Sequence, residues 1–191
     1  MEIENMRKLT YFLTLAAIVL SFSAIFVNGQ TPTPPITKTE PEKAPAAADY
    51  TLVIENEDGK QTKLGAAELG KLKRQSVKAG SDGKELAFEG FALVDVLKLG
   101  GVEFGETLRG KRLATFLLVE AADDYQAVFA LPELDPAFNE KVVLLTDKRD
   151  GQAISKAEGP LRLVVPGEKK AGRWVRQVTV LKILRATAPS K

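Results

Sequence analysis

The chain has 191 residues, with 27 basic and 25 acidic side chains and a formal net charge of +2. A nucleic-acid-binding domain would carry a strong basic bias, so this near balance excludes that class of protein. The sequence contains no histidine and no cysteine, which excludes disulfide bonds, His- or Cys-dependent nucleophilic catalysis and the usual kinds of zinc site.

The N-terminal segment is typical of an export signal. Arg7-Lys8 precedes an apolar run over residues 9–27, and Asn28-Gly29-Gln30 follows it. This order predicts a signal peptide over residues 1–29. The alternative is an uncleaved membrane anchor, because the apolar run is long enough to cross a bilayer about 30 Å thick. Both interpretations place the folded part outside the cytoplasm, in the periplasm or outside the cell, and only the second attaches it to a membrane.

Residues 30–48 follow as a segment rich in proline, threonine, lysine, glutamate and alanine, with almost no large apolar side chains. Such a composition cannot repay the entropy of ordering, so it predicts a disordered tether. Residues 49–185 are then expected to form one domain, large enough to bury a full core, and residues 186–191 a short tail.

The domain is predicted to be α+β and rich in strands, with two or three short helices. Alternation of apolar residues and turn residues between them predict strands at 50–54, 61–64, 75–79, 85–88, 113–121, 125–130, 142–146, 161–165 and 174–184. Helical spacing predicts helices at 66–72 and 91–97 and a single turn at 132–134. Gly100-Gly101 is a strong stop for the second helix.

Arg162 is the first candidate for ligand binding. It lies between Leu161 and Leu163 in a strand that otherwise has the pattern of a buried one. A buried guanidinium is costly unless it is paired, and its planar fork suits phosphate or carboxylate groups. Arg162 therefore either binds an anionic ligand, or forms an internal ion pair, or lies on an exposed edge, and the strand pattern leaves these alternatives open.

A basic loop follows that strand. The glycine-bounded segment 167–172 contains Lys169 and Lys170. Arg173 follows it directly and precedes Trp174, the single tryptophan of the chain. Loops of this kind wrap anions with side chains and backbone N–H groups, although a solvated hairpin tip has the same composition. The pair Asp123-Asp124 is interpreted as a polar turn between strands rather than a cation site, because aspartate favours turns.

Several motifs, in order, resemble the molybdopterin-binding domain of the sulfite-oxidase fold over about residues 50–184. Residues 88–97 resemble its strand and glycine followed by a leucine-patterned helix, and residues 121–127 its Asp-Gly-Tyr turn, with Asp124 where glycine is usual. Residues 142–154 resemble its strand followed by an Asn-Gly turn. The most specific parts are Gly-Pro-Leu-Arg-Leu-Val-Val-Pro at residues 159–166 and Arg-Trp-Val at residues 173–175.

The resemblance implies a mixed sheet and a molybdopterin cofactor. In that family, basic residues near the arginine-bearing strand and in the loop before the tryptophan hold the pterin and its phosphate. By position these are Arg162, Lys170 and Arg173. The family's oxidases also hold molybdenum through one cysteine ahead of the helix, but the corresponding tract here, Gln75–Gly80, has none. We therefore expect no metal ligand from the protein.

Three functional hypotheses follow. In the first, the domain is oxidoreductase-like but not a standard molybdenum oxidase, and binds a pterin-type or other small anionic ligand outside the cytoplasm. In the second, it is an active oxidoreductase that holds its cofactor through the pterin alone. In the third, it is a tethered, non-catalytic interaction module for a protein partner that the sequence does not identify.

Overall fold

The computed structural model describes residues 50–81 and 84–187. The predictions of a signal peptide or anchor over residues 1–29 and a tether over residues 30–48 lie outside the described residues, as do residues 188–191 of the predicted tail. Within the described part of the chain, no helix combines the length and the apolar character needed to cross a membrane.

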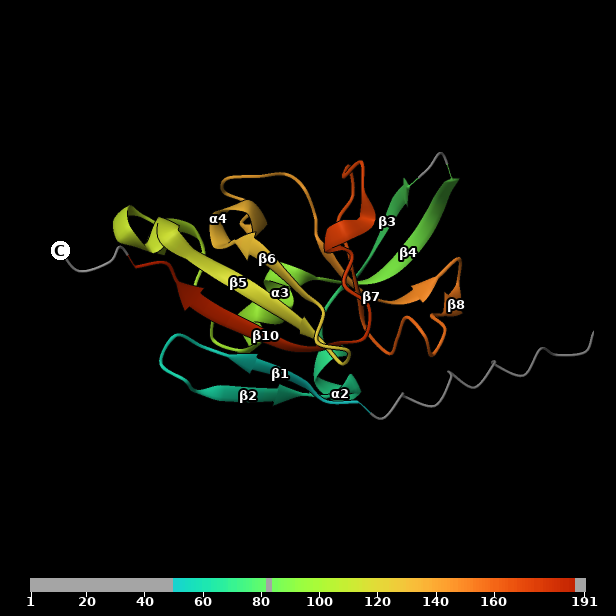
Figure 1. Cartoon of the computed structure of the whole chain (residues 1–191), viewed down its shortest axis with the longest axis horizontal. Coiled ribbons are helices and arrows are strands. Elements are labelled where there is room, and N and C mark those ends of the chain that lie inside the picture. Colours follow the sequence, from blue (N-terminus) through green and yellow to red (C-terminus); the bar gives the residue numbers. More distant parts are fainter. Residues whose placement is uncertain (1–49, 82–83, 188–191) are drawn as a thin grey trace, which may run out of the picture. The chain divides into compact units, whose positions relative to one another are not determined.

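The first sheet contains five strands in the order β2-β1-β10-β5-β6 (Figure 1). Its first and last strands along the chain, β1 and β10, run parallel in its middle, with Val53 opposite Val180, and every other pairing is antiparallel. The strands are β1 (Leu52–Glu55), β2 (Gln61–Leu64), β5 (Thr115–Ala121), β6 (Gln126–Ala130) and β10 (Val178–Arg185).

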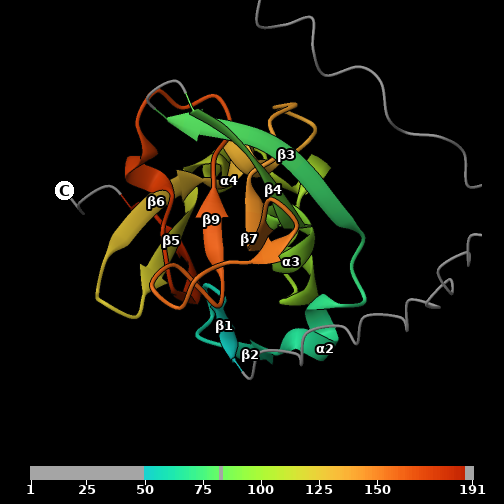
Figure 2. The same cartoon turned by 90° about the vertical axis from the view of Figure 1, so that its right-hand side faces the viewer.

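The second sheet is antiparallel and has the order β3-β4-β7-β8, with β9 also paired to β7. Figure 2 shows β9 beside β7, with β3 and β4 curving past them. These strands are β3 (Arg74–Ser81), β4 (Lys84–Ala92), β7 (Leu144–Arg149), β8 (Gln152–Ala153) and β9 (Arg162–Val164).

The helices are short and carry mainly packing residues. In α3 (Leu93–Leu99), Leu93, Val96 and Leu97 are fully buried. Gly100 follows the helix as its C-cap, and a Cβ atom there would lie 2.6 Å from Cγ2 of Ile54, so only glycine allows this close approach to β1. The other helices are α2 (Ala66–Leu69) and α4 (Leu131–Leu134), and the 3₁₀ turns are η1 (Gly105–Thr107), η2 (Gly110–Ala114) and η3 (Ala171–Arg173).

The predicted class, a β-rich α+β single domain with a mixed sheet and two or three short helices, is confirmed, with three such helices in the described part of the chain. The strict alternation of buried and half-buried residues along β5 explains why a strand could be predicted there. The helix predicted at 91–97 begins later, at Leu93, because Phe91 and Ala92 still pair with Leu145 and Leu144 of β7.

Other predicted boundaries also move. The final strand was predicted to begin at Trp174 but begins at Val178, because Gln177 adopts a left-handed conformation with φ of 49°. The helix predicted to run to Leu72 ends at Leu69. The strand predicted from residue 113 begins at Thr115, because the five residues before it form η2.

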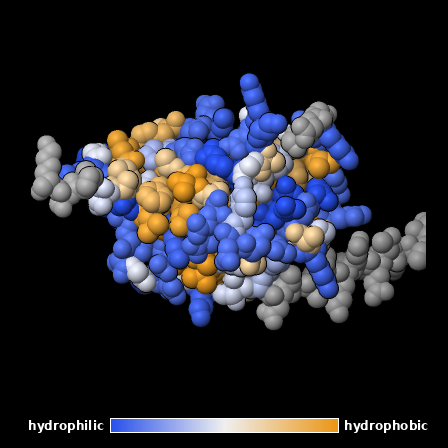
Figure 3. Space-filling view, viewed as in Figure 1, coloured by the Kyte–Doolittle hydropathy of each residue, from blue (hydrophilic) through white to orange (hydrophobic). Residues whose placement is uncertain are grey.

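One face of the first sheet packs on the core, and the other carries apolar side chains outward. Figure 3 shows these apolar side chains gathered over β5 and β6 on a surface that is otherwise largely hydrophilic. Val128 is 50% exposed, and Leu184 is 37% exposed. Phe116 and Leu118 are half-buried. They lie on the same face as the first two residues, because Leu118 is opposite Val128 and Phe116 is opposite Leu184. We term these four residues the outer apolar face.

Candidate functional site

A pocket of about 220 Å³ opens beside Arg162, and we term it the Arg162 pocket. Three segments form it: the turn between β5 and β6, strand β9, and the chain from η3 towards β10. Its lining combines two guanidinium groups, two aromatic side chains and one carboxylate, from Asp123, Tyr125, Arg162, Ala171, Gly172, Trp174 and Arg176.

Arg162 is held between aromatic rings. Its side chain is only 12% exposed, and its guanidinium carbon lies 5.7 Å from the ring centroid of Trp174 and 5.9 Å from that of Phe88. The rings of Trp174 and Phe88 pack edge to face, with their centroids 5.7 Å apart. The indole N–H of Trp174 donates a hydrogen bond to the carbonyl of Val165 at 3.1 Å, which fixes the orientation of the ring. Cation–π contacts and packing therefore restrict the guanidinium to one position.

Glu158 supplies a counter-charge within the chain. Its carboxylate accepts hydrogen bonds from Nη1 of Arg162 at 2.6 Å and from Nη1 of Arg149 at 2.8 Å. Burial lowers the pKa of Arg162 below its ordinary value, and the positive charges of Arg149 and Arg176 add to this effect, while Glu158 opposes it. Glu158 thus pairs with two of these three arginines, and the group keeps an excess of positive charge.

One N–H group of Arg162 has no acceptor. Its Nε atom is buried and has no hydrogen-bond partner among the described residues. A buried donor without an acceptor is costly and rare in native proteins. Because this Nε is closed off from solvent, an anion in the Arg162 pocket would bind the other N–H groups of Arg162 and those of Arg176, which also lines the pocket.

The turn between β5 and β6 forms one wall of the pocket. Asp123 accepts a hydrogen bond from the backbone N–H of Tyr125 at 3.2 Å, and Asp124 adopts a left-handed conformation with φ of 64°. The prediction of a polar turn at Asp123-Asp124 is thereby confirmed, and the left-handed conformation explains why glycine suits this position. The Tyr125 hydroxyl donates to the carbonyl of Gly172 at 2.5 Å, which joins this wall to the opposite one.

Arg173, a predicted ligand contact, is engaged within the protein. Its Nε donates to Glu168 at 2.7 Å, and its Nη1 donates to Glu133 at 3.0 Å and to the carbonyl of Val128 at 3.2 Å. Its guanidinium lies 4.5 Å from the ring centroid of Phe129. Burial lowers the pKa of Arg173, but the hydrogen bonds with Glu168 and Glu133 outweigh it and hold that pKa above its ordinary value. These contacts fasten the basic loop to the edge of β6.

The structure does not bring the three predicted residues into one pocket. Of these, only Arg162 lines the Arg162 pocket, Lys170 lies exposed on the neighbouring loop, and Arg173 points into a separate cluster. Arg176 lines the pocket although the sequence analysis did not select it. The sequence carried no clear signal for it, because the segment from Trp174 to Gln177 is not part of a strand and strand alternation does not apply there.

The pocket fits an anionic group better than a whole cofactor. Pockets that enclose drug-sized ligands hold about 300–1,000 Å³, so the Arg162 pocket suits a phosphate-sized end of a larger ligand, or a smaller anion. Within residues 50–81 and 84–187, no group of three or more His, Cys, Asp or Glu side chains lies together as metal ligands would. The tract Gln75–Gly80, where the family's oxidases would have a cysteine, lies in β3 and offers no thiolate. The residues present thus fit an anion and not a protein-held metal.

Comparison with known proteins agrees with this fold. A family model described as the oxidoreductase molybdopterin binding domain matches residues 80–191, so its match begins at the end of the Gln75–Gly80 tract. Among solved structures, the chain is similar to the sulfane dehydrogenase SoxCD from Paracoccus pantotrophus, with a TM-score of 0.56 and 21% identity. That similarity covers 74% of this chain and only 39% of the sulfane dehydrogenase chain, so it concerns the fold of one part of that protein. No curated protein matches the sequence.

Proposed function

This chain belongs to the oxidoreductase molybdopterin binding domain family, and we propose that it binds a pterin-type or other small anionic ligand in the Arg162 pocket. The observation that carries this proposal is that two guanidinium groups, those of Arg162 and Arg176, line one pocket. A phosphate-type anion supplies the negative charge and the acceptor oxygens that suit two guanidinium groups.

The basic residues have different roles in this proposal. Arg162 and Arg176 contact the anion directly, since both line the pocket. Lys170 contributes positive charge from the exposed loop at the side of the pocket. Arg173 holds this loop in place through Glu168, Glu133 and Val128, and a direct contact between Arg173 and the ligand stays a prediction from the sequence.

We also propose that the domain is not a standard molybdenum oxidase. A cysteine thiolate would anchor and tune the metal, and the chain has no cysteine to supply it. The order of basic, apolar and small residues in segment 1–29 supports export of the domain to the periplasm or outside the cell.

A second candidate function, a protein-interaction module, is favoured by the outer apolar face. Its four side chains are neighbours on one sheet face by register, and Figure 3 shows apolar side chains gathered over β5 and β6. Contiguous exposed apolar patches often mark contacts with a partner. This function does not require the Arg162 pocket to hold any ligand.

The proposal is tested by quantifying molybdenum and oxidised pterin per chain in the protein purified from its native envelope. Arg162→Glu serves as the test variant, and Arg109→Glu, on an exposed residue outside the pocket, as the matched control. We expect pterin without stoichiometric molybdenum in the wild type and in Arg109→Glu, and loss of pterin in Arg162→Glu.

Two other outcomes contradict the proposal. Molybdenum and pterin together in near-stoichiometric amounts would support the active oxidoreductase that holds its cofactor through the pterin alone. Absence of both, with no binding of inorganic phosphate to the purified protein, would leave the interaction module as the supported function.

A further inference from the structure

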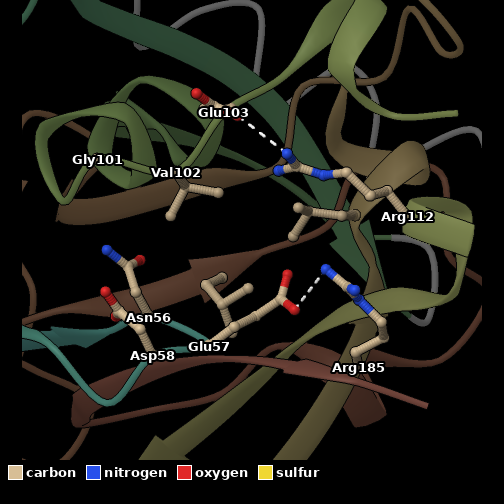
Figure 4. A pocket seen from close by; sticks show the side chains of 10 residues that line it. Asn56, Glu57, Asp58, Gly101, Val102, Glu103, Arg112 and Arg185 are labelled. Carbon is tan, nitrogen blue, oxygen red and sulfur yellow. Dashed lines mark hydrogen bonds and ion pairs between the residues drawn. The ribbon is translucent and has the colours of Figure 1, made fainter. Parts of the chain in front are cut away.

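A second pocket, of about 330 Å³, lies among elements that contribute nothing to the Arg162 pocket (Figure 4). We term it the Arg112–Arg185 pocket. Its walls come from the β1–β2 turn, the segment after α3, η2, the start of α4 and the end of β10. Its lining residues are Asn56, Glu57, Asp58, Gly101, Val102, Glu103, Arg112, Leu131, Ile183 and Arg185.

The walls of this pocket are fixed by hydrogen bonds. The side-chain amide of Asn56 donates to the carbonyl of Gly100 at 2.9 Å, which joins the β1–β2 turn to the end of α3. Gly101 adopts a left-handed conformation with φ of 84°, and the backbone N–H of Val102 bonds back to the carbonyl of Leu97 at 3.2 Å. The pocket is therefore preformed, so a ligand does not need to order its walls.

Two arginines define one side of the pocket. In Figure 4, the guanidinium groups of Arg112 and Arg185 lie on one side of the cavity, opposite Asn56 and Asp58. Arg112 pairs with Glu103 at 3.0 Å, and Arg185 pairs with Glu57 at 2.6 Å. Both pairs are partly exposed, so each contributes little and a ligand carboxylate can share their donors at small cost. The buried Nε of Arg112 has no acceptor among the described residues.

The opposite side offers an unpaired carboxylate. Asp58 accepts one backbone hydrogen bond, from Lys60 at 3.0 Å, and forms no ion pair among the described residues. Between the two sides, Val102, Leu131 and Ile183 are buried and provide apolar contact. The pocket thus places two paired arginines, one carboxylate without an ion-pair partner among the described residues, and an apolar floor around one cavity.

We infer that the Arg112–Arg185 pocket binds a small zwitterion of the amino-acid class with an apolar side chain. The ligand carboxylate accepts hydrogen bonds from the two guanidinium groups, and its ammonium group pairs with Asp58. Its side chain packs on Val102, Leu131 and Ile183. This inference is independent of the proposed function, because the two pockets share no residue.

The probe is L-leucine, titrated into the ¹⁵N-labelled full chain while the amide signals of Gly101 and Val102 are followed. Two comparison compounds each lack one charge: 4-methylpentanoate has no ammonium group, and 3-methylbutylamine has no carboxylate. We expect saturable shifts with L-leucine and at least tenfold weaker binding of either comparison compound, as the loss of one charged hydrogen bond predicts.

Arg112→Gln and Asp58→Asn are each expected to weaken L-leucine binding at least tenfold, whereas Arg109→Gln, an exposed neighbour outside the pocket, leaves it unchanged. Thermal unfolding of each variant checks that the fold is intact. If Arg112→Gln does not fold, Asp58→Asn still tests the inference, because the asparagine oxygen can accept the same hydrogen bond from the backbone N–H of Lys60. Absence of shifts with L-leucine, or equal binding of all three compounds, would overturn the inference. An unchanged phosphate response in the Arg162 pocket would then show that the proposed function stands separately.

Discussion

The carboxylate of Glu158 lies 2.6 Å from Nη1 of Arg162, so the arginine of the candidate pocket has its counter-charge only four residues away in the chain. The same carboxylate also pairs with Arg149 at 2.8 Å. A ligand anion at Arg162 must therefore share donors with an internal carboxylate. The strength of ligand binding is set by that competition as much as by the positive charge of the pocket.

Replacement of Glu158 is expected to separate stability from binding. Glu158→Gln leaves two partly buried guanidinium groups without their carboxylate, so the free energy of unfolding should fall by about 2–4 kcal/mol. Phosphate should bind about tenfold more tightly, because its internal competitor is gone. Urea unfolding and a phosphate titration followed by Trp174 fluorescence measure the two effects.

The matched control for this prediction is Glu85→Gln, whose carboxylate forms only an exposed pair with Lys78 at 4.0 Å. This variant should change the free energy of unfolding by less than about 0.5 kcal/mol. If Glu158→Gln loses stability while phosphate affinity stays the same, an anion does not compete with Glu158, and the proposed position of the anion is wrong.

Arg173→Gln should act on the loop and not on the ligand. The change removes charged hydrogen bonds to Glu168 and Glu133, so the free energy of unfolding should fall by about 1–3 kcal/mol. Phosphate affinity should change less than about threefold, whereas Arg162→Gln should lower it at least tenfold. A loss of affinity in Arg173→Gln as large as in Arg162→Gln would show that Arg173 contacts the ligand directly.

Tyr50 should make the stability of the domain fall at high pH. Burial, and then the charge of Asp147, raise the pKa of Tyr50 to about 12, although Arg74 acts in the opposite direction. Between pH 10 and 12 the unfolded chain loses this proton while the folded protein keeps it, so the free energy of unfolding decreases as the pH rises.

Because Tyr50 is only half-buried, solvent reduces this effect to about 1 kcal/mol between pH 9 and pH 11. Urea unfolding at these two pH values should therefore show that the wild type loses about 1 kcal/mol more than Tyr50→Phe does. The difference between the two proteins cancels the titration of lysines, which both contain. Equal losses in the two proteins would mean that Tyr50 ionises at its ordinary pKa.

Gly90 should not tolerate a side chain. A Cβ atom at this position would lie 2.1 Å from the carbonyl oxygen of Leu145, at a point where the register between β4 and β7 shifts. Because the clash involves backbone, Gly90→Ala should cost about 3 kcal/mol or more in the free energy of unfolding. Gly172→Ala is the control, since nothing lies within 4 Å of its Cβ position. Urea unfolding of both variants distinguishes a steric effect from a general intolerance of alanine.

Strands and helices could be predicted where the local pattern of apolar and turn residues is enough to define them. The apolar alternation of β5 and the glycine pair after α3 are visible without a structure. The segment from Trp174 to Gln177 could not be predicted in this way. Its conformation depends on a hydrogen bond from Leu163 to Val175 and on the left-handed Gln177, and the first of these requires a distant strand.

The same distinction applies to the candidate site. Arg162 could be selected because a charged residue interrupts an apolar strand. Its pairing with Glu158 could not be predicted, because Glu158 lies before β9 and outside any helix, so spacing alone does not bring the two side chains together. Arg173 was predicted to contact the ligand together with Arg162, but its side chain instead reaches Glu133 and Phe129, which are distant in the chain.

The parallel pairing of β1 with β10 also constrains the order in which the domain can be assembled during synthesis. The β1–β2 hairpin is made first, but the strand that joins it to β5 and β6 is the last one to leave the ribosome. An isolated two-stranded hairpin is marginal in water, and contacts between distant parts of a chain form slowly. The first sheet is therefore completed only after translation of residue 185, and a chain that stops before Val178 lacks the strand that joins the β1–β2 hairpin to β5 and β6.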